Sequence, residues 1–228
     1  MGGWDGKVET CLQGTCSIPI WTIMSRIFAA FLALLFFVLP VTAETKTIMA
    51  LGDSLTAGYG LEPQAAFPVK LEAALKAKGH DVVVINAGVS GDTAAQGEAR
   101  FDWALTDKVD AVIIELGAND ALRGLEPSQA EAALIKIMDK LAAKNLPVLI
   151  AGMKAPPNLG PDYVAKFDGI YQRLAEKYGV PLYPFFLDGV AADLALNQSD
   201  GIHPNAKGVD IIVARMLPAV EALVQQAK

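Results

Sequence analysis

Cysteine and histidine are both scarce in this chain of 228 residues, which has two of each. Cys11 and Cys16 precede a segment with the features of a secretory signal, so the chain after it has no thiol and needs no disulfide. Two histidines are too few for the usual histidine-rich zinc site, and we expect no metal. Thiol catalysis, a disulfide scaffold and a metal-dependent hydrolase are therefore disfavoured.

Clustered positive charge and aromatic side chains are also lacking. The formal net charge is −6, no block of lysine and arginine occurs, and aromatic residues make up 7% of the chain. Nucleic-acid binding relies on clustered positive charge and on base stacking, so we expect no nucleic-acid partner. The hydrophobic content of 53% is enough for one well-packed domain, and no linker, repeat or low-complexity stretch interrupts residues 44–228.

The longest apolar run, residues 27–39, is shorter than the roughly 20 residues that a membrane-spanning helix needs. It follows a basic start at residues 24–26 and precedes small residues up to Ala43, which is the order of a secretory signal. We predict a signal peptide over residues 24–43, cleaved after Ala43, with a retained N-terminal anchor as the alternative. The mature chain, residues 44–228, would be periplasmic or secreted, and its lack of cysteine favours a bacterial periplasm.

Residues 1–23 do not resemble the basic beginning of a signal. They contain Asp5 and Glu9 against a single basic residue, Lys7. We therefore predict that translation begins at Met24 and that residues 1–23 are a misassigned leader. N-terminal sequencing of the precursor would contradict this if it found upstream residues.

Five short apolar runs alternate with helix-like patterns after the signal. The predicted strands cover residues 47–51, 81–87, 111–116, 148–151 and 180–183. The predicted helices cover residues 64–78, 93–105, 126–144, 161–178 and 204–225, the last with Pro204 as its first residue. Because the strands are continuously apolar and each is followed by a helix, we predict an α/β fold. Its form is a three-layer α/β/α sandwich with a five-stranded parallel sheet.

Ser54 directly follows the first predicted strand, in the segment Gly52-Asp53-Ser54-Leu55. Open α/β folds bind ligands at the carboxyl edge of the sheet, so Ser54 is a candidate nucleophile. Alone, the tetrapeptide is weak evidence, because a serine after a strand can simply cap a helix. The G-x-S-x-G turn of the standard α/β-hydrolases is absent, since position 56 is Thr56 and the next glycine is Gly58.

A serine nucleophile needs a base, a carboxylate that orients the base, and donors for the oxyanion. His203 is the credible base, because His80 enters its strand at the opposite edge of the sheet. Asp200, three residues before His203, could orient the ring, while the Gly91 N–H and the Asn119 amide could serve as donors. Structural alternatives exist for each: helix entry for His203, turns for Asp200 and Gly91, and a helix cap for Asn119.

Four sequence blocks occur in the order found in one known family. They are Gly52-Asp53-Ser54-Leu55, Ser90-Gly91-Asp92-Thr93, Gly117-Ala118-Asn119-Asp120 and Asp200-Gly201-Ile202-His203-Pro204-Asn205. With these blocks, residues 46–220 resemble the SGNH (GDSL) hydrolases, and most of all the bacterial periplasmic group of thioesterase I, lysophospholipase L1 and arylesterase.

The resemblance implies that Ser54 is the nucleophile, His203 the base and Asp200 the residue that orients the base. It also implies an oxyanion hole formed by the N–H groups of Ser54 and Gly91 and by the amide of Asn119. A flavodoxin-like three-layer fold comes with the family, in agreement with the strand count, and no cofactor is needed. The expected reaction is hydrolysis of carboxylic esters or thioesters through an acyl-Ser54 intermediate.

The expected partner is a small acyl ester or thioester, including lysophospholipids, and the protein is expected to be a monomer without a membrane span after signal cleavage. Apolar residues on loops after the third and fourth strands could line an acyl groove, or could pack those loops onto the core. They are Leu122, Leu125, Met153, Pro156, Pro157 and Leu159. A carbohydrate acetyl esterase and, less favoured, a non-catalytic flavodoxin-like binding module are the alternatives.

Two acidic residues near these blocks need a separate interpretation. Asp53, next to Ser54, is expected to brace the loop rather than to react. Glu115 lies inside an apolar strand run, where burial without a partner would be costly. We therefore expect Glu115 to have a partner or to face solvent near the end of its strand.

Overall fold

The computed structural model describes residues 1–3 and 44–227. The predicted signal peptide, residues 24–43, and all but the first three residues of the predicted leader lie outside the described residues. Within the described ranges, no helix is both long enough and apolar enough to cross a membrane.

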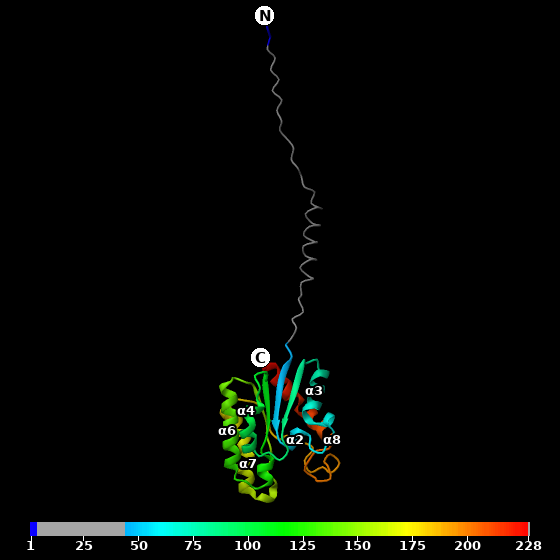
Figure 1. Cartoon of the computed structure of the whole chain (residues 1–228), viewed down its shortest axis with the longest axis vertical. Coiled ribbons are helices and arrows are strands. Elements are labelled where there is room, and N and C mark those ends of the chain that lie inside the picture. The colour runs from blue at the N-terminus through cyan, green and yellow to red at the C-terminus, as the bar shows by residue number, and fades with distance from the viewer. Residues whose placement is uncertain (4–43, 228) are drawn as a thin grey trace. The chain divides into compact units, whose positions relative to one another are not determined.

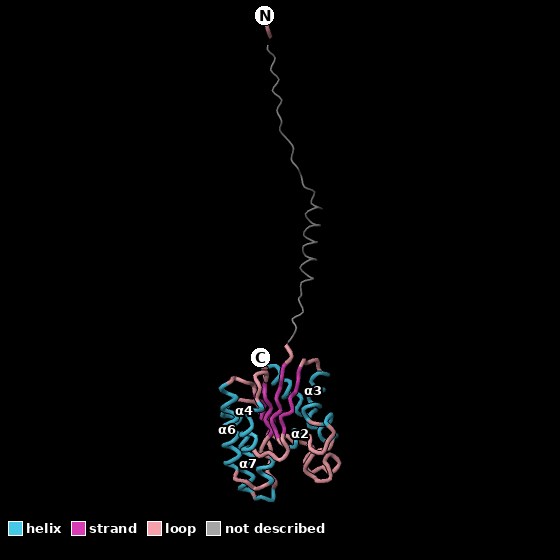
Figure 2. Tube along the Cα trace, viewed as in Figure 1, coloured by secondary structure: helices cyan, strands magenta, loops and turns pink. Residues whose placement is uncertain are grey.

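A five-stranded, wholly parallel sheet forms the centre of residues 44–227 (Figure 1, Figure 2). In sheet order, the strands are β2 (Val82–Gly88), β1 (Lys46–Gly52), β3 (Ala111–Glu115), β4 (Val148–Ala151) and β5 (Leu182–Tyr183). The predicted number and direction of the strands are confirmed. The shortest strand, β5, is only 2 residues long and uses half of the predicted run 180–183.

The strand order determines where a ligand crevice can form. From β1 the chain goes to the edge strand β2 and then crosses back to β3, on the other side of β1. Loops diverge at such a switch point and leave a crevice outside the carboxyl ends of the strands. The order 2-1-3-4-5 is the flavodoxin-like one, so the loops after β1 and β3 flank the expected crevice.

Helices cover both faces of the sheet and complete the predicted three-layer sandwich (Figure 1). One face carries α3 (Phe67–Ala77) packed against α8 (Ala206–Gln226), and the other carries α4 (Ala94–Ala104), α6 (Pro127–Ala143) and α7 (Pro161–Tyr178). Shorter elements lie in the loops: α2 (Ser54–Ala57), α5 (Ala118–Leu122) and the 3₁₀ turns η1 (Pro63–Ala65) and η2 (Pro157–Leu159). Because both faces are covered, β3 and β4 are buried along their whole length, which is why their apolar runs do not alternate.

The start of α8 differs from the prediction. Asn205 caps this helix, because its side-chain oxygen accepts hydrogen bonds from the N–H groups of Lys207 at 3.0 Å and Gly208 at 3.1 Å. The prediction that Pro204 is the first residue of the helix is therefore wrong. Pro204 lies before the cap, where it forms an isolated antiparallel bridge with Asn197.

Prolines mark the start of three other helices. In α3, α6 and α7 a proline occupies the first or second position of the helix. Proline suits this position because the N–H that it lacks would have no acceptor within the helix. In α3 this residue is Pro68, so the helix begins at Phe67 rather than at residue 64. The residues before it form η1.

Candidate active site

Ser54 lies where β1 has ended and the one-turn helix α2 begins. The cap of this helix is Asp53, whose Oδ1 accepts a hydrogen bond from Leu55 N at 2.9 Å. The alternative that Ser54 merely caps a helix is therefore wrong, and its hydroxyl is available to another partner. The tight turn needs the preceding Gly52, because a Cβ there would lie 2.1 Å from Thr56 Oγ1.

Ser54 and His203 are 149 residues apart in the chain, yet Ser54 Oγ lies 2.9 Å from His203 Nε2. The other ring nitrogen, Nδ1, lies 2.6 Å from Asp200 Oδ2. The structure therefore brings the three predicted catalytic residues into one chain of hydrogen bonds. Such a chain can take the proton of the serine hydroxyl and stabilise the imidazolium that results.

Asp200 also holds the backbone of the loop that carries His203. Its Oδ1 accepts hydrogen bonds from the N–H groups of Ile202 and His203, both at 3.0 Å. The hydrogen bond with the His203 ring, together with these two, lowers the pKa of Asp200 to about 2. The carboxylate is thus ionised at neutral pH and able to fix the orientation of the ring.

Tyr59 packs against the ring of His203, with 4.6 Å between the ring centroids and 39° between the planes. Its backbone is tied to the histidine loop, because Gln198 Nε2 donates to Tyr59 O at 2.7 Å and to Pro204 O at 3.0 Å. Neither Tyr59 nor Gln198 was predicted as part of the site. The one sequence signal for them is their nearness to two of the family blocks.

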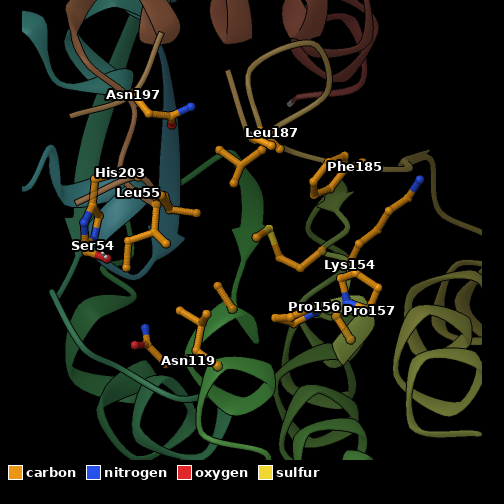
Figure 3. A pocket seen from close by; sticks show the side chains of 18 residues that line it. Ser54, Leu55, Asn119, Lys154, Pro156, Pro157, Phe185, Leu187, Asn197 and His203 are labelled. Atoms are coloured by element: carbon orange, nitrogen blue, oxygen red, sulfur yellow. Dashed lines mark hydrogen bonds between the residues drawn. The ribbon is translucent and has the colours of Figure 1, made fainter. Parts of the chain in front are cut away.

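The candidate oxyanion donor Asn119 lies in α5, after β3. Its Nδ2 donates to Asp53 Oδ2 at 3.1 Å and to Asp92 O at 3.0 Å. In Figure 3 the amide is directed from α5 toward Ser54 and His203. Both amide protons therefore have protein acceptors, and an oxyanion would have to share or displace one of them.

Gly91 lies in the loop between β2 and α4 and has a φ of +88°, a conformation that favours glycine. Among the described residues, neither the Gly91 N–H nor the Ser54 N–H has a hydrogen-bond acceptor. Both backbone donors are therefore available to a ligand. Gly91 does not itself line the cavity that contains Ser54 and Asn119.

Two buried carboxyl groups lie beside the turn that carries Ser54. Glu115 is 1% exposed, and its Oε2 accepts from Thr56 Oγ1 at 2.8 Å and from Asp53 N at 3.4 Å. Burial raises the pKa of Glu115 well above its ordinary value and raises the pKa of Asp53 to about 6. The prediction that Glu115 has a partner is confirmed, and the solvent-facing alternative is wrong.

An apolar cavity of about 300 Å³ opens beside Ser54 and His203 (Figure 3). These two residues lie at one end of it, whereas Lys154, Pro157 and Phe185 lie at the other. The walls come from the loops that follow β3, β4 and β5. A linear apolar group bound to Ser54 would therefore extend toward Phe185.

Of the six apolar loop residues that could line an acyl groove or pack onto the core, four line this cavity: Leu122, Met153, Pro156 and Pro157. Leu125 and Leu159 do not. Leu125 follows α5, where its N–H donates to Asp120 O at 2.9 Å, and Leu159 packs against the core from η2.

Within the described part of the chain, no three histidine, cysteine, aspartate or glutamate side chains are grouped so that they could hold a metal ion.

The sequence and fold agree with those of known acylhydrolases. Residues 50–211 match the GDSL-like Lipase/Acylhydrolase family. The chain belongs to this family. It is 38% identical over 203 residues to Thioesterase 1/protease 1/lysophospholipase L1 of Escherichia coli strain K12, covering 88% of this chain and 96% of the relative. It is 37% identical over 182 residues to Esterase TesA of Pseudomonas aeruginosa, covering 79% of this chain and 90% of the relative.

A solved structure with the same fold is that of AlinE4, an SGNH-hydrolase family esterase. It is 48% identical to this acylhydrolase, with 79% of this chain and 97% of that chain covered and a TM-score of 0.67. The resemblance to the SGNH (GDSL) hydrolases is thereby confirmed. The chain is a carboxylic ester hydrolase of the esterase, thioesterase and lysophospholipase type.

Proposed function

We propose that this acylhydrolase cleaves carboxylic esters and thioesters through a covalent acyl intermediate on Ser54. The observation that carries the proposal is the distance of 2.9 Å between Ser54 Oγ and His203 Nε2. A serine hydroxyl is a weak nucleophile until an adjacent base removes its proton. Asp200 holds the opposite nitrogen of the ring, so that Nε2 faces the serine.

In the acylation step, Ser54 Oγ bonds to the carbonyl carbon of the substrate while its proton passes to His203 Nε2. The carbonyl electron pair moves onto oxygen, where the N–H groups of Ser54 and Gly91 and the amide of Asn119 stabilise the charge. The bond to the leaving alcohol or thiol then breaks, and His203 gives that group its proton. Water attacks the acyl-Ser54 ester in the same way, which releases the acid and restores the serine.

The cavity supports an acyl group of medium length as the preferred substrate. Its volume of about 300 Å³ lies at the small end of the range for ligand pockets, and Met153, Phe185 and Leu187 make its walls apolar. Each buried methylene contributes about 0.8 kcal/mol, or about fourfold in kcat/KM, until the cavity is full. Lysophospholipids and simple esters or thioesters with such chains are the proposed substrates.

We also propose that the enzyme acts in the periplasm or is secreted. The support is the signal-like order of residues 24–43, with an apolar run between a basic start and small residues. Fractionation of cells that express the full chain tests this directly. Recovery of activity with the cytoplasmic fraction alone would contradict it.

Covalent labelling tests the proposed mechanism. A fluorophosphonate is expected to add to the peptide that contains Ser54, and mass spectrometry of a digest identifies the site. The Ser54→Ala variant should not be labelled. A folded wild-type protein that never reacts at Ser54 would refute the mechanism and favour the non-catalytic binding module.

A series of p-nitrophenyl esters from acetate to dodecanoate tests the proposed acyl length. We expect kcat/KM to rise with chain length and then to level or fall once the cavity is filled. A sharp preference for acetate would refute the apolar acyl site and favour the carbohydrate acetyl esterase.

A further inference from the structure

The loop that carries Gly91 contains a β-turn whose geometry decides where the Gly91 N–H points. Asp92 N donates to Val89 O at 3.1 Å, which closes a four-residue turn. Of its two central residues, Ser90 and Gly91, only Gly91 has a positive φ, of +88°. This is the pattern of a type II turn. A type I turn differs mainly by a reversal of the central peptide, which is the peptide that contains the Gly91 N–H.

Arg123 contacts this turn at Gly91 itself. Its Nη2 donates to Gly91 O at 2.7 Å. Among the described residues, Arg123 makes no ion pair with a carboxylate within 4.0 Å, so this carbonyl is its principal partner. The hydrogen bond therefore restrains one side of the glycine whose other side offers the free N–H.

Arg123 also caps the helix that carries Asn119, the side chain proposed as an oxyanion donor. It is the C-terminal cap of α5, and its backbone N–H donates to Asn119 O at 3.1 Å. Asn119 in turn donates from Nδ2 to Asp92 O at 3.0 Å, the carbonyl next to that of Gly91. The first turn of α5 and its C-terminal cap thus hold two successive carbonyls of the turn, Asn119 that of Asp92 and Arg123 that of Gly91.

The remainder of the loop is restrained independently of Arg123. Arg100 of α4 pairs with the Asp92 carboxylate and donates to Gly52 O at 3.0 Å. Asp120 Oδ2 accepts from Ala94 N at 2.8 Å. Loss of Arg123 should therefore loosen the backbone at Gly91, where the turn hydrogen bond from Asp92 N remains, without detaching the loop.

We propose that Arg123 is a positioning residue, which holds the Gly91 carbonyl so that the Gly91 N–H stays directed at the oxyanion. The proposal rests on the proposed function, in which this N–H stabilises the transition state. Arg123 need not touch the substrate for this role. Its contribution should therefore appear in kcat and not in KM.

The primary test compares Arg123→Met and Arg123→Lys with the wild type on p-nitrophenyl butyrate, a neutral ester. Removal of a whole oxyanion donor costs about 10²–10³ in kcat, so a donor that is only misdirected should cost roughly tenfold. We expect Arg123→Met to lose that factor in kcat with KM and the thermal unfolding midpoint unchanged. Arg123→Lys, which can still donate to a carbonyl, should recover part of the loss.

Arg173→Met is the matched control. Arg173 is a half-exposed arginine on α7 that pairs with Glu131, on α6. Exposed pairs of this kind contribute little, so its activity should stay within about twofold of the wild type. Arg123→Met within twofold of the wild type would overturn the proposal. A raised KM with unchanged kcat would also overturn it, because Arg123 would then bind substrate.

A double-mutant cycle separates positioning from an independent effect of the positive charge. Gly91→Ala strains the positive φ and should lower kcat by about 10² on its own. Because Arg123 acts through Gly91, adding Arg123→Met to Gly91→Ala should change kcat by less than about twofold. Losses that multiply would overturn the proposal. Fluorophosphonate labelling of wild-type Ser54 distinguishes failure of the proposed mechanism from failure of the role given to Arg123. If Ser54 is not labelled, the mechanism is refuted. If Ser54 is labelled, only the role of Arg123 is in question.

Discussion

Asn119 Nδ2 donates to Asp53 Oδ2 at 3.1 Å, so the residue before Ser54 holds the side chain proposed to stabilise the oxyanion. Asp53 Oδ1 caps α2 at the same time, through Leu55 N. One buried carboxylate therefore fixes both the turn that carries Ser54 and the amide of Asn119. This matches the expectation that Asp53 braces the loop.

Replacement of Asp53 by asparagine should change how stability depends on pH. The pKa of Asp53 is about 6 in the folded chain, because the group is buried, against an ordinary value of about 3.9 in the unfolded chain. Between these values the folded chain binds more protons than the unfolded chain, so this residue lowers the unfolding free energy as the pH rises from about 4 to about 7.

Urea unfolding at about pH 4 and about pH 8 measures this effect. Asp53→Asn should gain stability relative to the wild type at the higher pH. The comparison with the wild type cancels the titration of shared groups that do not interact with Asp53. A difference that stays constant, or that changes in the opposite direction, would contradict the pKa of Asp53.

Ser54→Ala and His203→Ala should each lower kcat by about 10⁴ or more. The first variant lacks the nucleophile that forms the acyl intermediate, and the second lacks the base that activates it. Asp200→Asn should lower kcat by about 10²–10⁴, since it removes the charge that orients His203. Hydrolysis of p-nitrophenyl butyrate measures all three, and circular dichroism checks the fold. Activity near that of the wild type in any folded variant would contradict the role given to that residue.

Ala155→Leu should shorten the preferred acyl chain. Ala155 lines the cavity and is almost fully buried. It follows Lys154 in the chain, which lies at the end of the cavity far from Ser54 in Figure 3. A leucine at this position takes the space of about two to three methylenes of the acyl chain. The kcat/KM for p-nitrophenyl octanoate should therefore fall roughly tenfold or more. The rate for acetate, which does not reach that end, should stay within about twofold. An equal loss for both esters would show that the variant disturbs the site as a whole.

Glu115 should behave as a neutral acid at pH 7. Its burial raises its pKa well above the ordinary value, and its Oε1 has no partner among the described residues. Glu115→Gln keeps an acceptor for Thr56 and adds no charge, so its unfolding free energy should stay within about 1 kcal/mol of the wild type. Glu115→Ala should lose about 2 kcal/mol or more, because it leaves a cavity and an unpaired hydroxyl.

Chemical denaturation of both Glu115 variants at pH 7 makes that comparison. If Glu115 were instead ionised and accepting from Asp53 N and Thr56 Oγ1, its replacement by glutamine would lose charge-assisted hydrogen bonds and cost about 1.5–3 kcal/mol. A loss of that size in Glu115→Gln would therefore contradict the neutral state.

Much of the fold could be predicted because buried parallel strands leave a clear pattern in sequence. The runs that became β3 and β4 are apolar without alternation, as a sheet covered on both faces requires. The start of α8 could not be read in the same way, because Pro204 and Asn205 both suit a helix start. The helix begins after Asn205, because its side chain accepts from the N–H groups of Lys207 and Gly208, which have no partner within the helix.

The site was predictable where chemistry restricts the choice of residue. Only one of two histidines lay at the right edge of the sheet, which left His203 with Asp200 three residues before it. Tyr59, Arg123 and Phe185 were missed, because a ring contact, a bond to a carbonyl and a cavity wall need no fixed spacing. Each acts through tertiary contacts that no short motif records.

The two hydrogen bonds of His203 join parts of the chain that are synthesised at very different times. Asp200 lies three residues before His203, so these two residues leave the ribosome together. They lie on a loop closed by the bridge between Asn197 and Pro204. Ser54 emerges 149 residues earlier and has no base until that loop reaches it. The loop leads directly into α8, which packs on α3. The triad is therefore complete only when the loop that leads into α8 has reached Ser54, so ester hydrolysis requires that these distant parts of the chain have come together.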